Sequence, residues 1–371
     1  MARAKGNGCR LMLSYFLVTT LAVWLAALAG SRAAAGPEGS ILPTRKSLAW
    51  FAAFLSGSLL VAMSVFRFEI GTDYRGYVYN FENSYRTWTW SQFEWSEEPG
   101  IEILTWIVVR IHDDYAFLIG LAGLITVGLF MRTYAKYSTV FALSVLFFVL
   151  TGPLHGSFNG VRQYLAAAIV LAGHEFIVDR KFVRFALVVG LATLFHVSAL
   201  VLILLYFVPR KRLSLVSVAA LAGAALLASY GYEFAGNLIG SIRARDVISG
   251  SYFVEQLNPL RIALAFVPFL SYLLFSQKDK ISDRSHFHIN MSLVFAVLYL
   301  AAAGSAHLAR FAIYALPFLA LAIPAVIQSA APRTRNTLAF VLIVVHAAFW
   351  YIEIIGSPDL YPFAWQFPWS D

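Results

Sequence analysis

The hydrophobic pattern of this chain is a series of long apolar runs separated by short polar or charged segments. Several runs approach or exceed the roughly 20 residues that an α-helix needs to cross about 30 Å of hydrocarbon. They predict membrane helices near residues 11–30, 47–65, 115–131, 138–152, 161–178, 215–233, 262–276, 288–304, 310–330 and 337–356. The pattern therefore predicts an all-α, polytopic membrane protein with about 10–12 transmembrane or half-spanning helices.

The same pattern divides the chain into three parts. Residues 1–46 hold a first helix and a linker, and residues 47–356 form a single polytopic membrane domain with an outer-face loop at 66–114. Residues 357–371 form an aromatic C-terminal tail. The first apolar run follows basic residues as in a signal peptide, but it is long for one, so we expect a retained helix.

Composition agrees with this class and excludes others. The chain is 60% hydrophobic and 13% charged, with a mean hydropathy of +0.70, which no soluble fold could bury. The net charge of +8 does not indicate nucleic-acid binding, because the basic residues gather in short clusters between apolar runs. Cys9 is the only cysteine, which excludes an intrachain disulfide and a cysteine-based metal site.

The basic clusters set the predicted topology, since short cytoplasmic loops carry an excess of Lys and Arg. The clusters assigned to the cytoplasm are Arg132/Lys136, residues 179–184, residues 210–212, Lys278/Lys280/Arg284 and Arg333/Arg335. The 66–114 loop, the 151–160 turn and the tail from Pro358 then face outward. Arg3, Lys5 and Arg10 also lie outside in this scheme, against the usual bias. Residues 99–112 are predicted to form a helix in the outer interface.

Residues 182–209 carry basic clusters at both ends yet are long enough for only one span. A single helix would place one cluster on the wrong side of the membrane. Two short helices that meet at a turn avoid this, and the polar break Phe195-His196-Val-Ser198 is the candidate turn. Non-helical backbone at that depth is tolerated where protein or a watery cavity surrounds it. The alternative is an ordinary span with one mis-sided cluster.

The 66–114 loop is acidic and rich in aromatic residues. Its acidic residues, which outnumber its four arginines, are Glu69, Asp73, Glu82, Glu94, Glu97, Glu98, Glu102, Asp113 and Asp114. Tyrosine, tryptophan and phenylalanine alternate with them. Carboxylates bond sugar hydroxyls and flat apolar rings stack on pyranoses, so this composition suits a sugar site. The alternative is an interfacial aromatic belt with solvated charges.

Three short motifs follow one another along the chain. They are Arg67-Phe-Glu-Ile-Gly-Thr-Asp-Tyr74 with Tyr77, then Asn159-Gly-Val-Arg162-Gln163, then Leu194-Phe-His196-Val-Ser. In this order they resemble the EpsG family of exopolysaccharide-biosynthesis membrane proteins, which are Wzy-like polymerases. The resemblance runs from about residue 47 to about residue 330 and leaves out the N-terminal segment and the aromatic tail.

The resemblance implies a polymerase of the bacterial cytoplasmic membrane with a GT-C-like helical fold and no cofactor. Such an enzyme transfers a growing glycan from undecaprenyl pyrophosphate onto the next lipid-linked repeat unit at the outer face. Its partners are the undecaprenyl-pyrophosphate-linked oligosaccharide and membrane lipid. A flippase and a chain-length regulator of the same pathway are further candidate partners.

The strongest candidate for anion binding is Arg162. Asn159-Gly160 is a plausible helix start, which would place this guanidinium beside free backbone N–H groups at the positive end of the helix dipole. That arrangement suits pyrophosphate. The alternative is an arginine that snorkels to lipid head groups.

The remaining candidates are weighed in the same way. Asp73 matches the acidic position of the family and is a candidate base for the acceptor hydroxyl, or else a solvated loop carboxylate. His196 matches the family histidine and is a candidate base or proton donor, or else a polar link between helices. Further substrate-binding candidates are Arg310 beside His307, Gln163, Arg67, Tyr74 and Tyr77, with Arg243, Arg245 and Arg261 weaker.

Two other classes of function remain open at this point. A transporter or flippase for lipid-linked oligosaccharide would also need outward cations, but it usually shows repeated halves, and no repeat is visible. A polytopic sugar O-acyltransferase would also carry an intramembrane histidine, but it would need an acyl-donor route from the cytoplasm. No metal-ligand spacing, Gly-x-Ser-x-Gly motif or phosphate loop occurs in the sequence.

Overall fold

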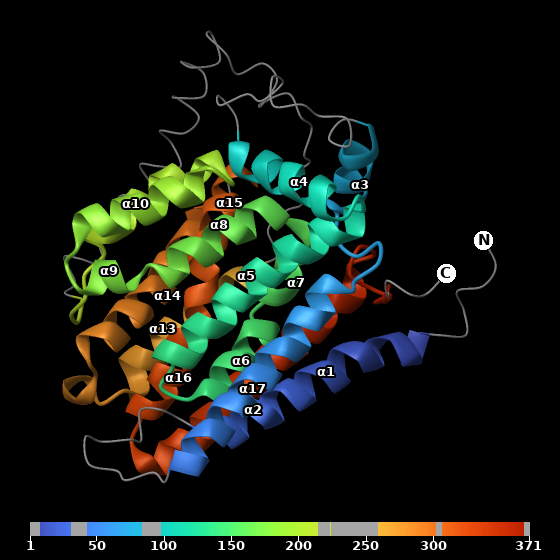
Figure 1. The fold of residues 1–371 in the computed structure, drawn as a ribbon. Coiled ribbons are helices and arrows are strands. Elements are labelled where there is room, and N and C mark those ends of the chain that lie inside the picture. The colour runs from blue at the N-terminus through green and yellow to red at the C-terminus, as the bar shows by residue number, and fades with distance from the viewer. Residues whose placement is uncertain are drawn as a thin grey trace.

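The computed structural model describes residues 8–30, 43–83, 98–213, 223, 259–301 and 306–366. Its first helices are α1 (Gly8–Ala29), α2 (Pro43–Val65), α3 (Tyr74–Asn83), α4 (Pro99–Ile111), α5 (Tyr115–Tyr137), α6 (Phe141–Leu150), α7 (Pro153–Asn159), α8 (Val161–Ala172) and α9 (Glu175–Val178). They are followed by α10 (Phe182–Thr193), the 3-10 helix η4 (Val197–Phe207), α13 (Pro259–Phe275), η5 (Lys278–Lys280), α14 (Asp283–Ala301), α15 (Ala306–Ala315), η7 (Leu316–Phe318), α16 (Leu319–Ser329) and α17 (Pro332–Gly356) (Figure 1).

The described part of the chain is all-α and polytopic, as the hydrophobic pattern predicts. Five segments in it are long and apolar enough to cross a membrane: Met12–Ala29, Leu48–Val65, Tyr115–Tyr137, Arg310–Ser329 and Pro332–Gly356. The pair α6 and α7 makes a sixth if its bend of 43° is counted within one span. The predicted helix at 215–233 lies outside the described residues.

Two predicted segments differ from the structure. The predicted 138–152 helix is present as α6, but residues 153–159 of the predicted 151–160 turn form the helix α7, because Gly152 adopts a left-handed φ of 104° and Pro153 then starts a new helix. The 161–178 span ends early, since α8 stops at Ala172 and α9 is a separate short helix. A Cβ on Gly173 would lie only 2.6 Å from the Val188 side chain, so this glycine allows α10 to pack closely where α8 ends.

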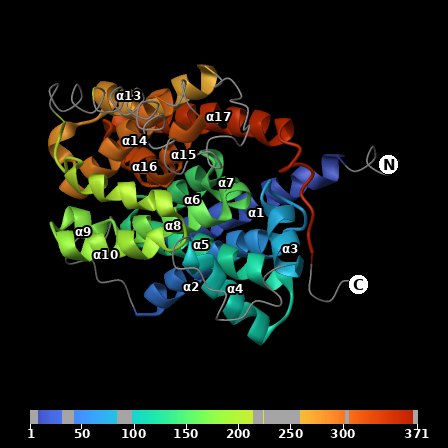
Figure 2. The same cartoon turned by 90° about the horizontal axis from the view of Figure 1, so that it is seen from above.

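The core and the lipid-facing surface follow from burial. From Gln163 to Leu171 every residue of α8 is buried, and α16 is buried from Leu319 to Ile327. Seen from above, α5, α6 and α8 lie in the middle, with α2, α13 and α17 further out (Figure 2). The outer helices expose large apolar side chains such as Trp24, Phe54 and Phe340, as expected of a surface in contact with lipid.

Residues 182–209 form the predicted hairpin. At Thr193 α10 ends, His196 is extended at φ −156° and ψ 116°, and η4 begins at Val197. The ring of Tyr206 near the end of η4 lies 5.0 Å from that of Phe182 at the start of α10, so the second helix returns beside the first. At ~1.5 Å per residue, the 12 residues of α10 span about 18 Å, too short to cross the bilayer.

The basic clusters assigned to the cytoplasm gather at one end of the molecule. Arg284 lies 4.9 Å from the ring of Tyr137, and Arg210 is close enough to Arg180 for the two charges to repel. Lys280 and Arg335 line one cavity. The charges of Lys136, Lys181 and Arg284 also act on Asp179, so all five predicted clusters take part. They lie away from α3 and α4 of the acidic loop (Figure 1).

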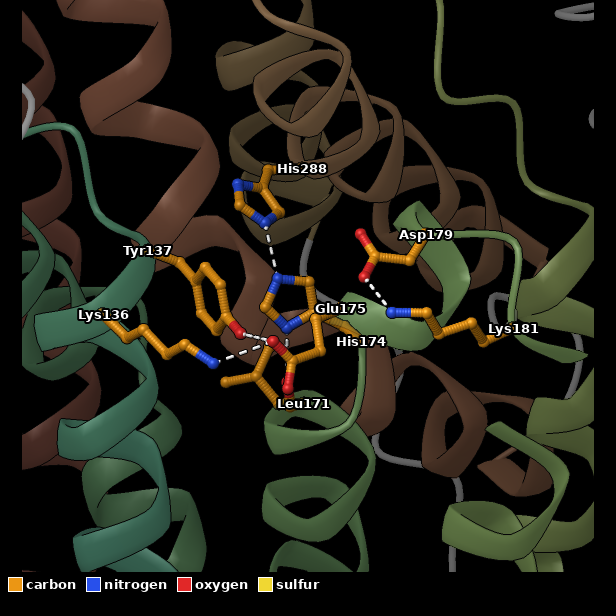
Figure 3. A network of polar contacts seen from close by, with 8 residues as sticks. All are labelled: Lys136, Tyr137, Leu171, His174, Glu175, Asp179, Lys181 and His288. Atoms are coloured by element: carbon orange, nitrogen blue, oxygen red, sulfur yellow. Dashed lines mark hydrogen bonds and ion pairs between the residues drawn. The ribbon is translucent and has the colours of Figure 1, made fainter. Parts of the chain in front are cut away.

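A polar network ties the helices together at this basic end (Figure 3). Lys136 donates to Glu175 at 2.8 Å, and the Tyr137 hydroxyl donates to the same carboxylate oxygen. The rings of His174 and His288, both buried, meet through their Nε2 atoms at 3.0 Å. The network therefore joins α5, the α8–α9 connection and α14.

The C-terminal tail packs against the segment that enters the acidic loop. The backbone N–H groups of Phe68 and Gly71 donate to Ala364 (3.0 Å) and Asp359 (2.8 Å), and the N–H of Gln366 donates to Phe66 (2.7 Å). Trp365 also donates through its indole N–H to Ser14 on α1 at 3.0 Å. The first helix and the tail thus pack against each other and against the start of the acidic loop.

The topology gives a labelling prediction. In a Cys9→Ser background, a cysteine at the exposed residue Glu82 reacts with an impermeant thiol reagent in intact cells, because it lies in the loop predicted to face outward. A cysteine at the exposed residue Asp279, between the basic Lys278 and Lys280, reacts only after the cells are opened. The reverse pattern would invert the whole arrangement. Ser157 is a poor reporter, since its side chain is buried.

Candidate functional site

Glu98 is the centre of a charged cluster at the end of the molecule that carries the acidic loop. Its Oε2 accepts a hydrogen bond from Arg162 Nη1 at 2.5 Å, and its Oε1 accepts from His196 Nδ1 at 2.5 Å and from the Val197 N–H at 3.0 Å. The Glu98 side chain is 13% exposed, His196 19% and Arg162 46%, so solvent reaches the cluster through the arginine. One carboxylate thus joins two of the predicted site residues.

The electrostatics keep Glu98 ionised. Burial alone would raise its pKa, but the hydrogen bond from His196 and the charge of Arg162 outweigh burial and hold the pKa of Glu98 below its ordinary value. The bond through Nδ1 leaves Nε2 of His196 without a partner among the described residues. That nitrogen is the ring atom with which the histidine can act on a substrate.

Asp73 is the second carboxylate of the cluster and has the opposite environment. Burial raises its pKa above the ordinary value, and the attraction of Arg162, Arg310 and His196 offsets only part of this effect. The residue nevertheless keeps a solvent-exposed surface. Two carboxylates whose pKa values shift in opposite directions are a common arrangement of an anchor and a base.

The loop that carries Asp73 is held against the turn between α7 and α8. Gly71 adopts a left-handed φ of 104°, and a Cβ there would lie only 2.0 Å from the Phe158 carbonyl oxygen. The Thr72 N–H donates to Asn159 Oδ1 at 3.1 Å. These two contacts place Asp73 beside the start of the helix that carries Arg162.

Glu98 is positioned by a second close contact. Pro99 starts α4, and the N–H of Gly100 donates to the Leu194 carbonyl at 2.7 Å. A Cβ on Gly100 would lie 2.8 Å from that oxygen, so only glycine permits this approach. The beginning of α4 therefore docks on the break between α10 and η4, where His196 lies.

The cluster extends onto α15. Gln163 donates through Nε2 to the Arg310 carbonyl at 2.6 Å, which fixes the start of α8 against α15. The Tyr314 hydroxyl is bonded to Ser198 Oγ at 2.8 Å and ties the same helix to η4. Arg310 itself is exposed and close enough to Asp73 to act on its charge.

Tyr77 on α3 is also part of the cluster. It lies beside Arg162, Asp73 and Glu98, whose charges act on its hydroxyl. Burial raises the pKa of Tyr77, so this hydroxyl remains protonated at neutral pH. It can therefore serve the site as a neutral hydrogen-bond donor.

Most of the predicted site residues therefore come together. Four segments far apart in sequence supply them: Asp73 and Tyr77, Arg162 and Gln163, His196, and Arg310. Arg261 lies elsewhere, paired with Glu353 and bonded to Tyr299 at 3.1 Å. Arg243, Arg245 and the side chain of His307 lie outside the described residues.

Arg67 and Tyr74 are not among the charged groups of the cluster. Arg67 is buried, donates to the Ser64 carbonyl at 2.5 Å and lies 5.0 Å from the Phe158 ring. The Tyr74 hydroxyl is bonded to Gln366 Oε1 at 3.4 Å. These three contacts fasten the beginning of the loop to α2, to α7 and to the tail. They are packing contacts and do not test the predicted substrate contact.

Glu98 is the functional candidate that the sequence interpretation missed. It is one of nine acidic residues in the loop, and no periodicity distinguishes it from the others. Its position directly before Pro99 is the available signal, because proline at the first position of a helix fixes where the preceding side chain emerges. Among the described residues, no group of three or more His, Cys, Asp or Glu is arranged to hold a metal ion.

Comparison with known proteins adds one finding about this chain. A family model described as the EpsG family matches residues 50–366. The matched region includes Glu98 and every predicted site residue. It also reaches the tail at Gln366, beyond the limit of about 330 expected from the motifs. No curated protein and no solved structure matches the chain.

Proposed function

The chain belongs to the EpsG family, whose members are polysaccharide polymerase-like, and from this premise we propose that it is a membrane glycosyltransferase that polymerises lipid-linked glycan. The proposed donor is a glycan on undecaprenyl pyrophosphate, and the acceptor is the next lipid-linked repeat unit. The proposed location is the outer face of the bacterial cytoplasmic membrane, opposite the basic end of the molecule.

One observation carries this proposal: Arg162 and His196 meet at Glu98, with Asp73 and Arg310 beside them. A pyrophosphate needs paired, charge-assisted donors, which the guanidinium groups of Arg162 and Arg310 supply. A sugar hydroxyl that attacks needs a base, and the raised pKa of Asp73 makes that carboxylate a stronger base than an ordinary aspartate. The cluster therefore holds groups for both halves of a glycosyl transfer.

The proposed reaction proceeds by displacement at the anomeric carbon of the donor. The acceptor hydroxyl forms a new C–O bond there as the bond from that carbon to the pyrophosphate oxygen breaks. The electron pair leaves with undecaprenyl pyrophosphate, held by Arg162 and Arg310, and Asp73 takes the hydroxyl proton. Glu98 remains ionised and orients His196 through Nδ1–H. In the imidazolium form that Glu98 stabilises, the Nε2–H of His196 donates a hydrogen bond to the leaving group.

The proposal is tested with purified protein and synthetic undecaprenyl-pyrophosphate repeat units. A ladder of products separated by single repeat units is the expected result. Repeat units that return unchanged from fully folded protein would refute the proposal. In cells, a deletion strain distinguishes the other classes. Repeat units trapped on the cytoplasmic side would indicate a transporter, and normal polymer that lacks an acyl group would indicate an acyltransferase.

A further inference from the structure

A polar cavity lies at the basic end of the molecule, opposite the charged cluster around Glu98. Its volume is about 300 Å³, and three connections line it: α5–α6, α13–α14 and α16–α17. Two cations, Lys280 and Arg335, face it together with the hydroxyl-bearing Ser282, Ser285 and Thr139. Its lining therefore combines positive charge with hydrogen-bonding groups.

The residues that line this cavity carry positive charge only, although Asp279 and Asp283 lie beside them in the sequence. No Asp or Glu lines it, and neither Lys280 nor Arg335 belongs to an ion pair among the described residues. The Nε atom of Arg335 is buried without a hydrogen-bond partner, and its Nη2 reaches only the Ala330 carbonyl, at 3.5 Å. Buried polar atoms are rarely left unsatisfied, so this arginine lacks a partner that an anion would provide.

Hydrogen bonds join the walls of the cavity to one another. Ser276 and Ala330 form an antiparallel bridge, and the N–H of Gln277 donates to the Ser329 carbonyl at 2.8 Å. The Ser329 hydroxyl also bonds Ser276 Oγ at 2.6 Å. These contacts hold the α13–α14 and α16–α17 connections together. Both α14 and α17 begin at the cavity, so the positive ends of their dipoles add to the local potential.

We propose that this cavity binds a phosphate group, carried either by an anionic lipid or by a soluble phosphate compound. Phosphate accepts several charge-assisted hydrogen bonds at once, which matches two cations surrounded by hydroxyl groups. The volume is at the lower end of the range for ligand sites, enough for a phosphate with a small attached group. The site is independent of the catalytic cluster and of the reaction proposed for it.

The position favours lipid as one source of the phosphate. The basic clusters around the cavity are those assigned to the cytoplasmic face, where anionic lipids create a negative surface that attracts Lys and Arg. A phospholipid head group at that face would lie level with the helix ends that line the cavity. Inorganic phosphate or a nucleotide from solution offers the same chemistry, so the experiment includes an arm for each source.

The experiment compares the wild-type protein with variants matched in charge. Lys280→Gln/Arg335→Gln removes the two cations of the cavity, and Lys278→Gln/Arg333→Gln removes two neighbouring cations that do not line it. Binding of phosphatidylglycerol in detergent is followed by native mass spectrometry, with phosphatidylcholine for comparison. Binding of inorganic phosphate is followed by the shift in Tm. Single variants at Lys280 and Arg335 serve if the double variant does not fold.

We expect the cavity variant to bind at least about tenfold more weakly than the wild type, because it loses charge-assisted hydrogen bonds. The matched variant keeps wild-type affinity. Loss confined to phosphatidylglycerol identifies a lipid phosphate, and loss confined to inorganic phosphate identifies a soluble one. Equal binding by the wild type and the folded cavity variant overturns the proposal, as does an equal loss in the matched variant.

Discussion

Arg162→Lys and Arg162→Ala both abolish visible long polymer at normal protein levels. The lysine keeps the charge but loses the planar fork that binds a pyrophosphate through two hydrogen bonds. Loss of one charged donor at the transition state costs roughly 2–4 kcal/mol, or about 30- to 800-fold in rate. The measurement is the polymer ladder in cells and the initial rate with purified protein.

Arg75 provides the matched control for this prediction. It lies on α3, is exposed, and pairs with Glu69 at 3.4 Å on the surface, so Arg75→Lys and Arg75→Ala leave the ladder unchanged. Normal ladders from Arg162→Ala would reduce Arg162 to a lipid anchor.

Glu98 extends the same test to the ion pair. If Arg162 and Glu98 act as one unit, the loss in the double variant Arg162→Ala/Glu98→Gln is smaller than the product of the two single losses. Independent, multiplicative losses would show that the ion pair is not the functional unit. The comparison uses initial rates with purified, folded variants.

Much of the fold could be predicted because the physics of the bilayer is simple. Apolar runs and basic clusters are enough to predict an all-α, polytopic protein with its charged loops sorted to two ends. They also predict the hairpin of α10 and η4. Basic residues lie at both ends of this short apolar segment, and a single span would place one of the two clusters on the wrong side of the membrane. Hydropathy does not show the breaks at Gly152 and Gly173, which depend on backbone conformation and on close packing against Val188.

The candidate site could be predicted only in part. The motif residues Asp73, Arg162 and His196 are brought together, since each lies at a turn or helix end where polar groups tend to gather. Glu98 could not be singled out, because its role depends on Gly100 docking against Leu194, a contact between segments far apart in the chain. Arg67 and Tyr74 look like their neighbours in the motif, but contacts with Ser64 and the tail place them in the packing.

Asp73→Asn and His196→Ala stop polymerisation but leave single repeat units on their lipid, exposed at the outer face. Removal of a general base typically lowers the rate by ~10²–10⁴, and asparagine keeps the shape of Asp73 while it removes the proton acceptor. In the proposed pathway another protein moves the repeat units across the membrane, so their translocation continues in both variants. The units are detected with an impermeant sugar-modifying reagent on intact cells.

Each of these two variants has a matched control in the acidic loop. Glu82→Gln replaces an exposed carboxylate near the end of α3 and is expected to leave polymer length unchanged. His112→Ala offers the same control for the histidine, since His112 is exposed at the end of α4. Equal losses in these variants would point to a general defect of the outer loop.

The pH dependence separates the two residues further. Because burial raises the pKa of Asp73, the ionised form that accepts a proton is lost at a higher pH than for an ordinary aspartate. The rate of the wild-type enzyme therefore falls on the acidic side at a pH above the ordinary value of 3.8, and residual activity in Asp73→Asn lacks that limb. An unchanged acidic limb in Asp73→Asn would transfer the role of base to His196, whose Nε2 is the other proton acceptor that the cluster offers.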